Sequence, residues 1–99
     1  MSLLRPEEVA ELRTYQRLAS YLDTREKFWT AEAKRMWREA AGTRFQEPAA
    51  IAAVLMSDLL RLEPKLRGIL VDIYKADRTL VLDWMYRVAM YFVDRAKLA

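Results

Sequence analysis

Residues 24–41, TREKFWTAEAKRMWREAA, carry the pattern that decides the fold, because as a helix they separate into chemically different strips. At about 100° per residue, the apolar side chains gather on one side of the helix. These apolar residues are Trp29, Ala33, Met36, Trp37 and Ala40. The basic residues gather on roughly the opposite side, and they are Lys27, Lys34, Arg35 and Arg38. The stretch therefore predicts an amphipathic helix that turns one face to a core and a basic face to solvent.

The basic strip accounts for the net charge of the whole protein. Six basic and three acidic residues lie between positions 25 and 44, and this local excess of +3 equals the formal net charge of the chain. Cations in this arrangement can neutralise phosphates along a nucleic-acid backbone, an interaction that carries little sequence information. An ordinary solvated helix face is the alternative interpretation, and the sequence leaves both open. The candidate nucleic-acid-binding residues are Lys27, Lys34, Arg35, Arg38 and Arg44.

The segments on either side of this stretch predict further helices. Pro6 fits the first turn of a helix, where acidic residues also follow it. Residues 23–26, DTRE, resemble a capping box, so a second helix is expected to begin there and to end at Gly42. Pro48 marks a third start, and residues 48–57 contain four alanines and no charge. This third helix is therefore expected to be central and buried.

The last third of the chain allows two interpretations. Pro64 disfavours helical geometry in the residue before it and so begins a new element. Either one helix ends before Asp77 and Asp77 caps another, or a single helix continues to Lys97. We favour the break at Asp77. Residues 80–93 are the most apolar stretch, with only two charges, and are expected at the centre of the bundle or at the seam of an oligomer.

These patterns predict an all-α protein, a compact bundle of four or five helices in a single domain over residues 1–99. No alternating strand pattern is present. The apolar share of 54% is above the roughly 45–50% of soluble domains, so we expect burial against a protein partner or a second copy. The residues proposed for such an interface are Trp84, Tyr86 and Tyr91, of which Trp84 is also expected to be buried.

The composition makes most enzyme classes improbable. The chain has no cysteine and no histidine, which removes thiolate chemistry, the usual metal ligands and the usual general base. Glu8 and Glu11 have the ExxE spacing with which all-helical nucleotide pyrophosphohydrolases hold Mg²⁺, but the required second acidic pair is missing. A role for these acids at a helix N-terminus is favoured. A helical mutase of the chorismate type matches in size and class only.

We therefore predict a non-enzymatic helical adaptor or assembly subunit that contacts a nucleic-acid backbone through its basic helix, within a larger complex. The alternative is a pure protein–protein interaction module, either a homo-oligomeric scaffold or an inhibitor, and a small helical enzyme ranks third. No cofactor and no metal are expected. The N-terminus lacks the apolar run of a signal peptide, and no segment reaches the roughly 20 apolar residues of a membrane span. The prediction is a cytoplasmic protein without membrane contact.

Overall fold

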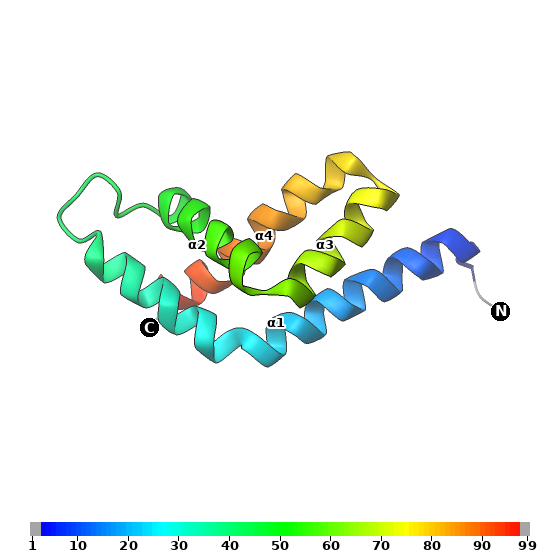
Figure 1. The fold of residues 1–99 in the computed structure, drawn as a ribbon, viewed down its shortest axis with the longest axis horizontal. Helices are drawn as coiled ribbons and strands as arrows, with labels where there is room; N and C mark the ends of the chain where they lie inside the picture. The colour runs from blue at the N-terminus through cyan, green and yellow to red at the C-terminus, as the bar shows by residue number, and fades with distance from the viewer. Residues whose placement is uncertain (1–2, 98–99) are drawn as a thin grey trace.

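The computed structural model describes residues 3–97, which form four helices and no strand. The helices are α1 (Pro6–Glu39), α2 (Pro48–Leu62), α3 (Pro64–Ala76) and α4 (Arg78–Lys97). The all-α prediction is thus confirmed, with four helices. The long helix α1 runs along one side of the molecule, and the other three lie on its concave side (Figure 1). Among them, α4 packs against α1, α2 and α3.

Proline and aspartate determine where the helices begin. Pro6, Pro48 and Pro64 occupy the first turns of α1, α2 and α3, where a missing N–H costs nothing. Asp77 separates α3 from α4, because its Oδ1 accepts hydrogen bonds from the backbone N–H and the hydroxyl of Thr79 at 2.9 and 2.6 Å. These bonds lower the pKa of Asp77 below its ordinary value. The predicted starts at Pro48 and Pro64 and the predicted break at Asp77 are confirmed.

The predicted helix start at residues 23–26 is wrong, because α1 continues through it. The Thr24 hydroxyl donates a hydrogen bond to the Ser20 carbonyl oxygen at 2.8 Å, so it serves inside the helix and caps nothing. Bonds of this kind tend to bend helices, and α1 is bent near its middle (Figure 1). The helix ends at Glu39, and Gly42 follows in the turn with a φ of 79°, which favours glycine.

The corner between α2 and α3 meets α1 through one carboxylate. Glu63 accepts hydrogen bonds from Trp29 Nε1 at 2.7 Å and from Arg25 Nε at 2.9 Å, and its side chain is only 13% exposed. Tyr21 is buried, and its hydroxyl has no hydrogen-bond partner among the residues that the structure describes. Burial, and next the negative charge of Glu63, raise the pKa of Tyr21, so its hydroxyl stays neutral. Through its hydrogen bonds with Trp29 and Arg25, Glu63 connects the corner between α2 and α3 to α1.

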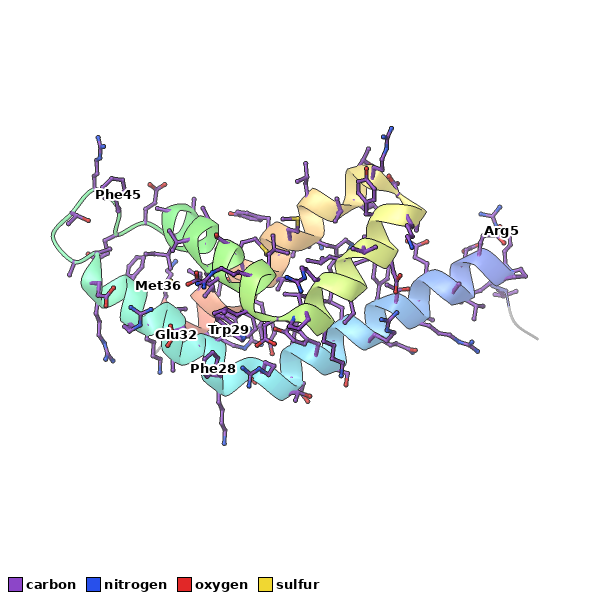
Figure 2. All side chains as sticks on the ribbon, viewed as in Figure 1. Arg5, Phe28, Trp29, Glu32, Met36 and Phe45 are labelled. Carbon is purple, nitrogen blue, oxygen red and sulfur yellow. The ribbon has the colours of Figure 1, made fainter. Side chains whose placement is uncertain are left out.

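All four helices contribute to one core. Trp29 and Met36 point from α1 toward the other helices, as predicted from the apolar strip (Figure 2). Other large core side chains from the four helices are Leu18, Leu55, Leu59, Leu66, Ile69, Val88, Phe92 and Val93. The helix after Pro48 is expected to be central and buried, and α2 is buried on one face, with Val54 55% exposed on the other.

The molecule is elongated. Its principal extents are 54, 23 and 23 Å, and its radius of gyration is 15.0 Å. A compact domain of this length has a radius of gyration of about 13 Å. The difference comes from α1, whose 34 residues span about 51 Å at 1.5 Å per residue. The bundle is therefore less compact than predicted.

Candidate nucleic-acid interface

Three predicted cations form one row on α1, which we call the basic ridge: Lys27 and Arg38, which are exposed, and Lys34, which is partly exposed. Their spacings of seven and four residues place them within about 40° of one another around the helix and along about 16 Å of its length. The buried residues of α1 lie on the opposite side. Within residues 3–97, none of the three makes an ion pair within 4.0 Å. The ridge therefore presents uncompensated positive charge to solvent.

Arg35 does not belong to the basic ridge. Its guanidinium donates hydrogen bonds to Glu32 at 2.9 Å and to Glu39 at 2.8 Å. These contacts, with Glu32 contributing most, raise the pKa of Arg35. Glu32 lies beside Phe28 on α1 (Figure 2). The spacings of three and four residues were visible in the sequence and indicate such pairs, so this signal could have separated Arg35 from the strip.

Lys27 and Lys34 flank a shallow depression of about 330 Å³. The acid in its lining, Glu26, accepts a hydrogen bond from Arg95 Nε at 2.9 Å, so its charge is already compensated. Thr30 also lines the depression, and its buried hydroxyl oxygen has no hydrogen-bond partner within residues 3–97. The surroundings of the two lysines thus leave them available to an external anion.

Arg44 lies in the turn after α1, with its guanidinium 4.9 Å from the centre of the Phe45 ring. Phe45 projects from this turn at the far end of the molecule from Arg5 (Figure 2). Beside it lies an apolar groove of about 400 Å³ that the sequence did not reveal, lined by Met36, Glu39, Ala40, Thr43, Phe45, Ala50, Ile51 and Val54. The groove needs α2 to lie against the end of α1, a contact that no local pattern encodes.

The three predicted interface residues on α4 do not share one environment. Trp84 is partly buried rather than fully buried as expected, and its ring stacks on Tyr15 at 4.7 Å between centroids. Tyr91 is partly buried, with Arg95 3.4 Å from its ring centre. Only Tyr86 is exposed, one helical turn from Leu82, which is 70% exposed. Intramolecular contacts therefore occupy two of the three rings, and Tyr86 remains open to a partner.

The candidate acidic pair near the N-terminus has intramolecular partners. Glu8 accepts a hydrogen bond from Arg5 Nε, and Glu11 accepts one from the Tyr15 hydroxyl, both at 2.7 Å. The described part of the chain contains no group of three or more acidic residues placed to hold a metal ion. No helix within residues 3–97 is both long enough and apolar enough to cross a bilayer.

No protein family, curated protein or solved structure matches this chain.

Proposed function

We propose that this protein is a non-enzymatic helical adaptor that contacts the phosphate backbone of nucleic acid through the basic ridge, with Arg44 at one end, within a larger complex. One observation carries the proposal: Lys27, Lys34 and Arg38 stand in a row on the outer face of α1 and have no ion pair with any residue from 3 to 97. Arg35 is left out of the contact set, because two carboxylates already bind it.

The chemistry of the ridge fits phosphate better than bases. Lysine and arginine neutralise phosphates and release condensed counterions, which gives affinity without sequence readout. Base reading by a helix needs a set of side chains such as Asn, Gln and Arg pointing into a groove. Between Lys27 and Arg38 the outer face offers no Asn or Gln, and the hydroxyl oxygen of Thr30 on this face is buried. The proposal is therefore backbone binding without strong sequence preference.

The salt dependence of binding tests this proposal. The three or four phosphate contacts of the basic ridge and Arg44 should contribute about −2 to −3 to the slope in a log–log plot of affinity for single strands against salt. The double variant Lys34→Gln/Arg38→Gln should flatten this slope by about 1.4, and a matched variant, Lys75→Gln/Arg78→Gln, should leave more of it intact. Lys75 and Arg78 are exposed cations of α3 and α4, so the two variants change the net charge equally. Fluorescence anisotropy with labelled RNA and DNA measures both.

Two results would contradict the proposal. Wild-type protein that binds neither DNA nor RNA at low salt would leave the ridge as a solvated helix face. Equal loss in the two double variants would show that binding follows net charge alone and involves no defined surface. Unchanged thermal melting of both variants is the control for folding, because exposed cations contribute little to stability.

A second candidate function, a pure protein-interaction module, is favoured by exposed apolar surface. Val54, Leu82 and Tyr86 are each more than half exposed, and the apolar groove lies beside Val54. Leu82 and Tyr86 lie one turn apart on α4, Val54 lies on α2, and exposed apolar patches mark association sites. Analytical ultracentrifugation tests self-association directly. A monomer at high concentration that also binds no protein in its host would reject this second candidate.

A further inference from the structure

A second group of cations lies on α1, on the N-terminal side of the bend. It surrounds a shallow depression of about 470 Å³, lined by Arg13, Gln16, Arg17 and Ser20 of α1 and by Lys65 of α3. We call this the N-terminal depression. No carboxylate is among the described residues that line it. Arg13 and Lys65 are exposed and form no ion pair within the described part of the chain. Arg17 donates Nη1 to Asp72 at 2.7 Å and keeps its other guanidinium nitrogens for a further acceptor.

The lining of the depression consists of donors that lack acceptors. Three cationic groups, the amide of Gln16 and the hydroxyl of Ser20 surround one volume, and only Arg17 has a side-chain partner among residues 3–97. A tetrahedral oxyanion accepts several such bonds at once, and the arginine fork matches phosphate geometry. The first turn of α3 contributes Lys65, so the positive end of that helix dipole lies at the same place. Phosphate is the ligand chemistry that this set of groups recognises.

Arg13 and Ser20 of the depression share one face of a continuous helix with the basic ridge, and Lys65 reaches the depression from α3. Arg13, Ser20, Lys27 and Lys34 follow one another at intervals of seven residues, which brings each nearly in line with the last. Because α1 is unbroken, this line runs from Arg13 to Arg38 over about 37 Å. The outer face is convex, since α1 bends around the other helices (Figure 1). A flexible single strand can follow a convex face, whereas a duplex with a persistence length of about 150 base pairs stays straight over this distance.

We propose that the N-terminal depression is a second phosphate-binding site, and that one single strand follows the outer face of α1 and contacts the depression and the basic ridge together. This inference rests on the proposed function, which it narrows from nucleic acid in general to single-stranded nucleic acid. Arg13, Arg17 and Lys65 each bind phosphate oxygens, and the bases of the strand point away from the helix without being read.

The test measures the salt slope for oligouridine in three proteins: wild type, Arg13→Gln/Lys65→Gln, and the matched control Lys75→Gln/Arg78→Gln. The two contacts removed in the first variant should flatten the slope by about 1.4 relative to the control, at 0.7 per contact. A duplex of the same length should bind with a shallower slope than the single strand. The duplex slope should also be unaffected by Arg13→Gln/Lys65→Gln, because the straight duplex reaches the basic ridge alone.

The outcomes separate this inference from the proposed function. The Arg13→Gln/Lys65→Gln variant could keep the wild-type salt slope while the slope of Lys34→Gln/Arg38→Gln becomes flatter. In that case the ridge binds nucleic acid and the second site is rejected. If wild-type protein binds no strand at low salt, the spanning strand is rejected together with the proposed function. In that case a titration with inorganic phosphate, followed by the backbone amide signals of Ser20 and Lys65, still tests the depression alone. Saturable shifts that disappear in Arg13→Gln/Lys65→Gln support a phosphate site, and shifts that never saturate reject it.

Discussion

Substitutions of Glu63 should show whether its hydrogen-bond acceptor or its negative charge contributes more to the stability of the protein. Its carboxylate accepts hydrogen bonds from Trp29 Nε1 and Arg25 Nε. In Glu63→Leu the indole N–H of Trp29, a residue only 1% exposed, loses its acceptor inside the protein. An unsatisfied buried donor costs about 1 to 3 kcal/mol. The lost pair with Arg25, whose side chain is 39% exposed, adds at most about 1 kcal/mol.

Glu63→Leu should therefore lower the free energy of unfolding by about 1 to 4 kcal/mol, a large part of the roughly 5 to 15 kcal/mol available to a small domain. Glu63→Gln keeps an oxygen for Trp29 and removes only the charge, so it should cost about 1 kcal/mol or less. Urea denaturation followed by tryptophan fluorescence gives both values, provided that the m-value is unchanged. Wild-type stability of Glu63→Leu would refute the assigned role. Equal losses in the two variants would show that charge, and not the acceptor, holds the corner.

Three further predictions use simple assays. Trp29→Ala should cost about 3 to 5 kcal/mol in urea denaturation, whereas Trp84→Ala should cost only about 1 to 2, because part of the Trp84 ring already meets water. The ionised Asp77 cap contributes stability above its ordinary pKa of 3.8 and loses it as pH falls through the lowered folded-state pKa. Asp77→Asn should thus melt at a lower temperature than wild type at neutral pH, and this difference in melting temperature should shrink in acid. A difference that stays constant with pH would contradict the role of Asp77 as a helix cap. Arg35→Gln should leave the salt slope of nucleic-acid binding unchanged, and a flatter slope would place Arg35 among the phosphate contacts.

The sequence predicted the helix boundaries wherever backbone chemistry is decisive. Proline excludes a preceding helical turn, which identified the starts of α2 and α3, and Asp77 offers its oxygen to a free N–H. The capping-box pattern of Asp23 and Glu26 failed as a start signal because α1 continues through both residues, and the neighbouring Thr24 hydroxyl bonds backward to the Ser20 carbonyl. Whether such a pattern caps a helix depends on whether the helix continues. Here α2, α3 and α4 pack along both halves of α1 and favour continuation.

The surface proposed for binding could be predicted only where it depends on one helix. Lys27, Lys34 and Arg38 share a face by spacing alone, and the pairs of Arg35 could also have been inferred from spacing. The N-terminal depression could not, because it needs Lys65 of α3 beside Arg13 of α1. The predicted break in α1 also separated Arg13 from Lys27, and the seven-residue series through Ser20 becomes meaningful only in an unbroken helix.

The two proposed binding activities use different residues. The cations proposed for phosphate lie on α1, in the turn after it at Arg44 and on α3 at Lys65, whereas Leu82, which is 70% exposed, belongs to α4, and Val54 belongs to α2. Because α1 covers one side of the molecule and buries its own apolar face, strand binding and protein docking do not compete for the same residues. A chain of this size can thus hold a strand along its longest helix while its shorter helices dock on protein. Both proposed surfaces depend on the corner between α2 and α3, because Glu63 at this corner holds α1 against α2 and α3.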